Sequence, residues 1–541
     1  MAGEYNIPMS FLGGIMKTAL KKHFAFFLAL LTVTAVCFLF AVRKEGLFID
    51  EVYTYGLSNS YYAPFVADLK DGDMIDKVIT RQELFDYLTV NDSDKFSADS
   101  VYYNQTRDVH PPLYYWLFNF ASSLNQGSFS LWTGLILDFF LYFLTLVVLY
   151  ALVIKLFDSG DNAAAAVLLY GLSSIGLSTM IMIRMYVLLT LETVLLGYLI
   201  VCLMRNGKTW HYPAVAVTVF AGMMTQYYYV FYAFFVCLAF DVFLLIKRKY
   251  REFIMFSLSA LCGVLCLIPA FPAFLKQLTA DALVSGGSAM DNFMDFGQYA
   301  QRITLFVREA SHRMKAVIYA AGLSAALCIA LCGKIAAMMK KKEISAESLV
   351  LIIPALVTFF VVAIVSPVTE LRYIYNIVPM LVLTVSFLIY LAERGAGKLR
   401  HGLRVKKAAL LLVAAIALWE ARCVPPDYLY DEYSDYDALL AEHKSAPCIY
   451  IDDNFSSPLT YDMLQIMIFD ELMVTNDASS EKMLDYIGQS NEAVVFIDIS
   501  KDWASGYDAQ EVLEELNRTT GLTSTTPLYS NGFSDVYLLS R

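Results

Sequence analysis

The chain has 541 residues, of which 58% are hydrophobic and only 17% are charged. Because soluble proteins carry about a quarter charged residues, this composition excludes a purely soluble enzyme. The formal net charge of -11 is unevenly spread, since residues 425–541 hold 22 acidic and 5 basic side chains and the rest of the chain is net positive. This asymmetry predicts two domains in different surroundings, residues 1–424 in the membrane and residues 425–541 outside it.

Cysteine and charge patterns exclude two further classes. Most of the nine cysteines lie inside apolar runs, which is typical of small buried hydrophobic residues and not of a disulfide framework. A sustained basic surface interleaved with aromatic residues is absent from the sequence, so we expect no nucleic-acid partner.

The fold class predicted for residues 1–424 is an all-α polytopic membrane domain. An apolar stretch of about 18 residues or more is long enough to cross the bilayer as a helix. The first one, residues 24–42, follows a lysine-containing segment as a signal peptide would, but no small-residue cleavage site follows it, so we expect an uncleaved span. About eleven spans are predicted, at residues 24–42, 131–154, 163–181, 185–204, 210–225, 227–246, 253–275, 315–333, 349–366, 374–392 and 408–424.

The loop charges orient these spans. Lys and Arg concentrate in the cytoplasmic loops of membrane proteins, and here they cluster at 247–251, 340–342 and 394–407. Placing these clusters inside puts the N-terminus in the cytoplasm and exposes the loop 43–130 and the C-terminal domain to the exterior. The segment Leu113 to Leu124 is too short to span, and we expect it to be a helix lying in the outer interface.

Beyond Pro425 the pattern changes to short strand-like and helix-like runs. The strand-like runs are 448–451, 493–499 and 536–539, and the helix-like runs are 462–469, 481–488 and 509–516. Such alternation predicts a small extracytoplasmic α/β domain, in which we find no catalytic motif.

Two carboxylates directly follow the first span, in the sequence Gly-Leu-Phe-Ile-Asp50-Glu51-Val-Tyr53. Neighbouring side chains on a helix or strand point in different directions. One carboxylate can therefore enter a pocket while the other caps a helix or orients the first. The plainer alternative is a solvated acidic cap at the point where the chain leaves the membrane.

His110 lies at the far end of the same loop, in Asp108-Val-His-Pro-Pro-Leu-Tyr114-Tyr-Trp. The two prolines fix the backbone in front of the interfacial helix, which would hold the imidazole at the membrane surface. The alternative is a simple helix entry with aromatic residues anchored at the headgroups.

Two arginines interrupt apolar sequence. Arg184 precedes Tyr186 and a long apolar run, and Arg372 precedes Tyr373 with a proline seven residues after the arginine. Because an arginine near the membrane core is costly, it normally faces a cavity, a partner or an anion; the alternative is a side chain that snorkels to the interface. Gln226 and Tyr227 lie in a tyrosine cluster at a predicted external hairpin, and Asp138 and Asp241 within spans are interpreted as structural.

Taken together, a carboxylate pair, a histidine and two arginines lie at the external mouths of the helices. This combination suits a lipid-linked anionic substrate, because guanidinium groups bind phosphate oxygens bidentately. A transporter or flippase of lipid-linked saccharides is the competing hypothesis, but transporters place their polar residues near the midplane of the bilayer. A catalytically inactive scaffold that presents the acidic domain is a third.

These motifs, in this order, resemble those of the GT-C glycosyltransferases, and most closely family 39, which includes protein O-mannosyltransferases and the lipid A aminoarabinose transferase. The resemblance covers residues 20–400. It implies a glycosyltransferase that moves a hexosyl or pentosyl group, with inversion, from a polyprenyl-phosphate donor to an extracytoplasmic acceptor hydroxyl on a glycan, lipid or protein. The sequence lacks the Trp-Trp-Asp motif of the metal-dependent oligosaccharyltransferases, so we expect no metal and no other cofactor. It also lacks the luminal repeats of eukaryotic O-mannosyltransferases, which favours a prokaryotic cell membrane.

The resemblance also implies roles for the residues. Asp50 would be the general base, and Glu51 would orient the acceptor or hold the loop. Arg184 and Arg372, with His110, would bind the departing phosphate. The substrate pocket would be formed by Tyr53, Tyr114, Tyr186, Gln226, Tyr227 and Tyr373.

Overall fold

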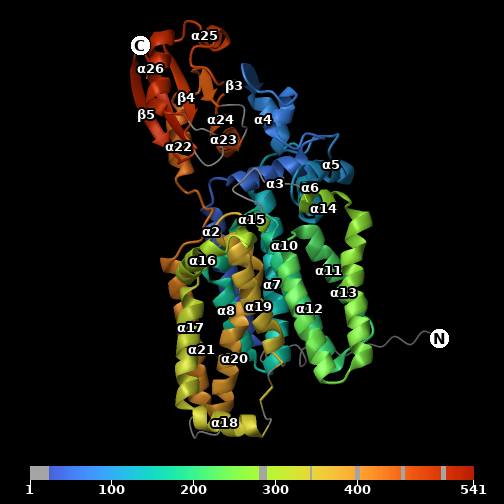
Figure 1. The fold of residues 1–541 in the computed structure, drawn as a ribbon. Helices are drawn as coiled ribbons and strands as arrows, with labels where there is room; N and C mark the ends of the chain where they lie inside the picture. The colour runs from blue at the N-terminus through green and yellow to red at the C-terminus, as the bar shows by residue number, and fades with distance from the viewer. Residues whose placement is uncertain are drawn as a thin grey trace, which may run out of the picture.

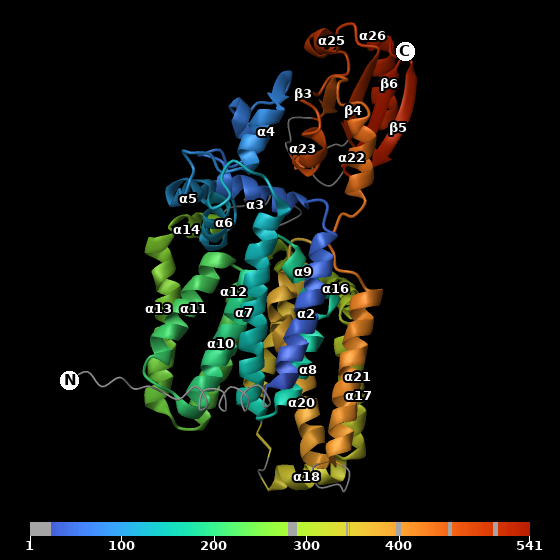
Figure 2. The same ribbon diagram turned by 180° about the vertical axis from the view of Figure 1, so that it is seen from behind.

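The computed structural model describes residues 23–279, 289–341, 344–345, 347–396, 402–452, 457–500 and 507–541. It consists of a long helical bundle with a small α/β domain projecting from one end (Figure 1). We call that end of the bundle the domain end. The long loop, residues 43–130, covers the domain end beside the α/β domain (Figure 2).

The bundle is built from apolar helices. Among the described residues, six helices are long and apolar enough to span a membrane, or up to eight if each of two bent helix pairs is one span. Leu349–Val365 is a shorter apolar helix. The chain is a multi-pass membrane protein, while the count of eleven spans stays a prediction. The bundle helices are α2 (Phe24–Val42), α7 (Leu131–Phe157), α8 (Gly160–Gly171), α9 (Ser174–Ile181), α10 (Tyr186–Asn206), α11 (His211–Thr225), α12 (Tyr229–Ile246), α13 (Tyr250–Ala270), α16 (Tyr299–Arg313), α17 (Lys315–Ala330), α18 (Cys332–Lys340), α19 (Leu349–Val365), η3 (Leu371–Ile377), α20 (Val378–Ala396) and α21 (Gly402–Cys423).

The predicted span 163–181 is broken in the structure. Helices α8 and α9 meet at an angle of 63°. Ser173 caps α9 by accepting a hydrogen bond from the backbone N–H of Gly176 at 3.1 Å, as expected for a serine at a helix N-terminus. The break sends the chain along the domain end, where the turn 182–185 carries Arg184.

The long loop forms a layer of short helices over the domain end. Its elements are α3 (Ile49–Asn59), η1 (Val66–Lys70), β1 (Lys77–Thr80), α4 (Arg81–Leu88), α5 (Ala98–Arg107) and α6 (Leu113–Ser123). Helix α6 matches the predicted short helix at 113–124 and lies with α3 and α5 above the bundle (Figure 1). Three further short elements lie between α13 and α16, namely α14 (Ala273–Thr279), α15 (Ala289–Met294) and η2 (Phe296–Gln298).

The C-terminal domain contains a six-stranded sheet in the order β1-β3-β2-β4-β6-β5. The central strands β3, β2 and β4 are parallel, and β6 and β5 extend the sheet in antiparallel fashion. The edge strand β1 comes from the long loop and pairs antiparallel with β3, Lys77 opposite Val474. The elements of this domain are α22 (Tyr433–Ala441), β2 (Cys448–Ile451), α23 (Ser457–Tyr461), α24 (Met463–Ile466), β3 (Glu471–Thr475), α25 (Glu481–Ile487), β4 (Glu492–Asp498), α26 (Ala509–Thr520), β5 (Ser524–Ser530) and β6 (Ser534–Ser540).

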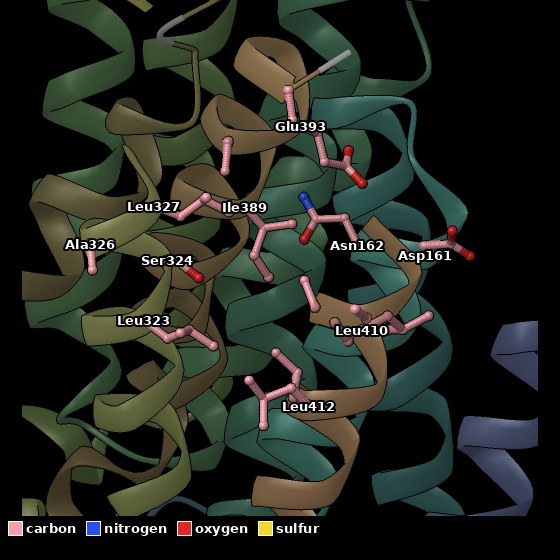
Figure 3. A pocket seen from close by; sticks show the side chains of 16 residues that line it. Asp161, Asn162, Leu323, Ser324, Ala326, Leu327, Ile389, Glu393, Leu410 and Leu412 are labelled. Carbon is pink, nitrogen blue, oxygen red and sulfur yellow. The ribbon is translucent and has the colours of Figure 1, made fainter. Parts of the chain in front are cut away.

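An apolar cavity of about 350 Å³ lies between α8, α17, α20 and α21 (Figure 3). Leu323, Leu327, Ile389 and Leu410 line it, with Asn162 as one of few polar groups (Figure 3). Its walls are mostly apolar and offer few hydrogen-bond partners, whereas the charged residues predicted for the site gather at the domain end.

Candidate active site

The first turn of α3 sends its two carboxylates to different places. Glu51 is fully buried. Its carboxylate accepts hydrogen bonds from the backbone N–H groups of Phe48, at 2.6 Å, and Ile183, at 2.7 Å, and it lies 2.9 Å from the ammonium group of Lys44. Burial raises the pKa of Glu51 and lowers the pKa of Lys44, and each opposite charge counteracts the shift of the other.

Asp50 keeps part of its carboxylate exposed. Its side chain is 22% accessible, and its Oδ2 lies 3.3 Å from Nη1 of Arg372. Burial alone would raise the pKa of Asp50, but the positive charges of Arg372 and Arg184 outweigh it, so the pKa lies below its usual value. Asp50 is therefore ionised at neutral pH and can accept a proton.

Arg184 connects α3 to the turn between α9 and α10. Its Nη1 donates to the backbone carbonyl of Asp50 at 2.9 Å and to Oγ1 of Thr54 at 3.2 Å. Its guanidinium lies over the ring of Tyr115, 5.6 Å from the centroid, a geometry that favours a cation. Its Nε has no hydrogen-bond partner among the described residues, so donor capacity is left for an anion.

Arg372, at the start of η3, is 9% exposed. Its guanidinium lies against the rings of Phe48, at 5.2 Å, and Tyr373, at 5.6 Å. Its Nη1 contacts Oε2 of Glu370 at 2.7 Å as well as Asp50. One nitrogen therefore joins two carboxylates. Burial raises the pKa of Glu370, although Arg372 opposes that shift.

His110 completes the cluster. Its Nδ1 lies 2.8 Å from Oδ2 of Asp108 and 3.5 Å from Nη2 of Arg184. Burial would raise the pKa of Asp108, but the contact with His110 lowers it below the usual value. The backbone carbonyl of Asp108 accepts from Nε2 of Gln277 at 2.6 Å, which ties this turn to α14.

The structure thus brings together four of the predicted residues, Asp50, Arg184, Arg372 and His110, from four segments far apart in sequence. Glu51 is behind them in the protein interior, so of its two expected roles burial favours holding the loop. Tyr373 lies beside Arg372.

The other predicted pocket residues have different surroundings. Tyr114 is buried and donates to Asp138 at 2.8 Å. Gln226 is buried, and its Oε1 accepts from the backbone N–H of Tyr227 at 2.7 Å. Tyr186 packs edge-on against Tyr375 with ring centroids 6.0 Å apart, and Tyr53 packs in the same way against Phe65 at 6.1 Å. Tyr227 donates to Gln277 and so connects to the turn that holds His110.

Sequence reasoning missed Lys44, Tyr115 and Glu370. Glu370 could have been found, since it lies two residues before Arg372 in the same external segment. Lys44 gave no signal, because a lysine at the end of a span is ordinary. Within the described ranges no group of three or more His, Cys, Asp or Glu side chains could hold a metal ion.

Comparison with known proteins bears on this arrangement. Residues 109–275 match the family model described as dolichyl-phosphate-mannose-protein mannosyltransferase. The structure is similar to that of ArnT from Cupriavidus metallidurans bound to undecaprenyl phosphate, with a TM-score of 0.50 and 11% identity, over 94% of this chain and 97% of that one. The chain has the GT-C glycosyltransferase fold.

The fold implied by the resemblance to the GT-C glycosyltransferases is the fold that the structure has. The GT-C oligosaccharyltransferase of Archaeoglobus fulgidus is a more distant structural match, with a TM-score of 0.45 and 11% identity, over 97% of this chain and 75% of that one. No curated protein matches the chain in sequence. The matched segment 109–275 begins beside His110 and includes Arg184.

Proposed function

We propose that this protein transfers a sugar from a polyprenyl-phosphate donor to an acceptor hydroxyl at the domain end, with inversion at the anomeric carbon. The observation that carries the proposal is the cluster of Asp50, ionised and partly exposed, with Arg184 and Arg372. The undecaprenyl phosphate of the ArnT structure supports the donor class. The N-terminus would be cytoplasmic and the domain end extracytoplasmic, in a prokaryotic cell membrane.

The chemistry follows from the charges. Asp50 takes the proton of the acceptor hydroxyl as that oxygen attacks the anomeric carbon. The bond from this carbon to the phosphate oxygen breaks, and its electron pair leaves with the phosphate. Arg184 and Arg372 stabilise the added negative charge in a site where solvent is largely excluded. His110, held by Asp108, supplies a further donor at the edge of this site.

The competing transporter hypothesis fits this geometry less well. The charged residues lie in the loops and turns of one end of the bundle, whereas transporter sites lie near the midplane. The bent pair α8–α9 is a broken helix of the kind transporters use, but it delivers Arg184 to the domain end.

The test is replacement of Asp50 by asparagine. Asp50→Asn keeps the size of the side chain but removes the base, so transfer from a radiolabelled polyprenyl-phosphate sugar should fall by about 10²–10⁴-fold. Binding of undecaprenyl phosphate should stay within about threefold, because Asp50 does not hold the phosphate. Asp435→Asn, an exposed residue of α22, is the matched control. Full transfer by Asp50→Asn would overturn the proposal.

The phosphate site has its own test. Arg184→Gln should weaken undecaprenyl phosphate binding by tenfold or more, since a charge-assisted hydrogen bond contributes about 1.5–3 kcal/mol. Arg81→Gln, at an exposed position in the first turn of α4, is the control for loss of positive charge. Unchanged donor binding by Arg184→Gln would remove this residue from the site.

A further inference from the structure

A second cavity, of about 570 Å³, lies at the domain end, and Phe48 is one of the residues that line it. We call it the linker cavity, because residues 425–432, which lead from α21 to α22, form one wall. The remaining walls come from Arg43 and Phe48 in the connection between α2 and α3, from the C-terminal part of α16 and from the segment 369–375. None of the residues that line the cavity was among the site residues predicted from the sequence.

The linker cavity reaches the catalytic cluster through two of its wall residues. Glu370 lines the cavity and contacts Nη1 of Arg372, the same nitrogen that contacts Asp50. Phe48 also lines the cavity, and its ring lies under the Arg372 guanidinium. A molecule in the cavity would therefore be separated from Asp50 by the side chains of Glu370 and Arg372.

The cavity has a preformed shape. Arg43 pairs with Asp431 and Arg313 pairs with Asp427, so ion pairs hold the linker at two points. The backbone carbonyl of Tyr428 accepts from Lys44 at 2.6 Å, which fixes the linker to the buried ion pair below α3. Two non-glycine residues of the linker, Tyr428 and Tyr430, have positive φ angles of 67° and 52°. Such backbone persists where the surrounding structure requires it.

The chemistry of the walls distinguishes between classes of acceptor. Five acidic residues line the cavity against two arginines, and both arginines are already paired with linker carboxylates. Such a surface repels an anion and accepts hydrogen bonds from hydroxyl or ammonium groups. The lining also includes aromatic rings, which pack against the apolar faces of sugar rings. The acidic and aromatic residues of the lining are Glu309, Glu370, Asp427, Asp431, Glu432, Phe48, Tyr375, Tyr428 and Tyr430.

We infer that the linker cavity binds the acceptor, and that the acceptor is a hydroxyl-rich saccharide without negative charge, neutral or bearing an amine. The inference rests on the proposed function, to which it adds the acceptor class and the place of its entry. A saccharide hydroxyl reaching past Glu370 gives its proton to Asp50 and forms the new bond to the anomeric carbon, while the bond from that carbon to the phosphate oxygen breaks and its electron pair leaves with the phosphate.

The experiment uses the purified full chain and three photoreactive disaccharides of equal size. These probes carry a diazirine and are neutral, amine-bearing or phosphorylated. After irradiation, mass spectrometry locates the labelled peptides. The neutral and amine probes should label residues 425–432 and 369–371 at least about tenfold more than the phosphorylated probe does. An excess of the disaccharide without the diazirine should prevent this labelling. Equal labelling by the phosphorylated probe would overturn the assigned class.

Two variants make the test specific. Thr369→Trp fills the cavity and should reduce labelling and transfer to the neutral disaccharide by tenfold or more. Glu432→Lys should reverse the preference toward the phosphorylated probe, whereas Asp435→Lys, three residues on and outside the cavity, should not. Undecaprenyl phosphate binding is measured in every preparation to confirm folding.

The two proposals can fail separately. If undecaprenyl phosphate binds in a manner that depends on Arg184 but no probe labels the lining peptides, the linker cavity is not the acceptor site and the proposed function stands. If undecaprenyl phosphate does not bind the unmodified chain, the proposed function fails and this inference fails with it.

Discussion

The ammonium group of Lys44 lies 2.9 Å from the carboxylate of Glu51, and neither side chain is accessible to solvent. The pair joins the end of α2 to the first turn of α3. Glu51 also accepts a hydrogen bond from the backbone N–H of Ile183, the residue before Arg184. The pair therefore holds in one place the two segments that carry Asp50 and Arg184, the proposed base and one of the proposed phosphate ligands.

Breaking this pair should destabilise the fold. Lys44→Met leaves the carboxylate of Glu51 buried beside two N–H donors without its counter-charge, and loss of one partner of a buried pair costs about 3–5 kcal/mol. We expect a lower Tm for Lys44→Met in detergent, measured by intrinsic fluorescence. Lys44→Met with Glu51→Gln should recover much of the loss, because no charge is left unpaired. Arg43→Met, whose partner Asp431 is exposed, is the control; an equal loss there would contradict the special role of the buried pair.

Arg372 should set the pH dependence of the reaction. Burial raises the pKa of Asp50, and Arg372 is the largest opposing influence. In Arg372→Gln the burial effect is less compensated, so the pKa of Asp50 rises and a larger fraction is protonated at a given acidic pH. The acid limb of the kcat/KM profile should therefore move to higher pH.

The measurement is transfer from the polyprenyl-phosphate donor between pH 4 and pH 8 for both proteins. A uniform loss at every pH would mean that Arg372 binds phosphate without tuning Asp50. Arg313→Gln, which lies on the linker cavity and pairs with Asp427, should leave the position of the acid limb unchanged.

Much of the site could be predicted because its residues break apolar sequence. Asp50, Arg184 and Arg372 each border a long hydrophobic run, where charge is costly and so carries information. The hairpin at residues 225–226 also follows from length alone, and α11 ends at Thr225 as expected. The strand prediction 448–451 coincides with β2.

The rest depended on contacts distant in sequence. Lys44 and Tyr115 reach their partners, Glu51 and Arg184, only in the folded chain, where α2, α3 and α6 lie close together. Strand β1 has only four residues with polar flanks, so its sequence does not predict a strand. It forms a strand because it pairs with β3, which is distant in sequence. The predicted helix 462–469 is shorter in the structure, where α24 covers Met463–Ile466 and Asp462, directly before it, accepts a hydrogen bond from Tyr450 of β2. The break between α8 and α9 was hidden in uniformly apolar sequence.

Asp462 should make the C-terminal domain sensitive to pH. Its carboxylate is buried and accepts from Tyr450 at 2.7 Å and Asn531 at 2.6 Å. Burial raises the pKa of Asp462 to about 6, despite these hydrogen bonds. The folded state thus binds a proton more tightly than the unfolded chain, and stability from this group is present below the unfolded pKa and is lost as the pH rises through about 6.

Asp462→Asn should remove this dependence. As the pH rises from 4 to 7, the free energy of unfolding of the wild-type domain should fall relative to that of the variant by up to about 3 kcal/mol. Hydrogen exchange of the central strands at the two pH values measures the difference. Asp470→Asn, an exposed residue before β3, controls for loss of surface charge. The same pH response in Asp462→Asn as in wild type would contradict the assignment.

The α/β domain should depend on the long loop for its edge. Ile79, on β1, is fully buried, while Val78 on the other face of the strand is only partly buried. Ile79→Ala should weaken the β1–β3 contact by about 2–5 kcal/mol, the usual cost of such a truncation in a core. The amides of β3 should then exchange at least about tenfold faster.

Val78→Ala is the matched control and should have a smaller effect, because less apolar surface is lost. Unaltered exchange in β3 for Ile79→Ala would show that β1 is only an accessory to the sheet. If Ile79→Ala weakens the β1–β3 contact, residues 425–432 beside the linker cavity should also shift, because they lead into the same C-terminal domain that β1 holds at its edge. Labelling of 425–432 by the neutral disaccharide probe should then fall in Ile79→Ala and remain in Val78→Ala.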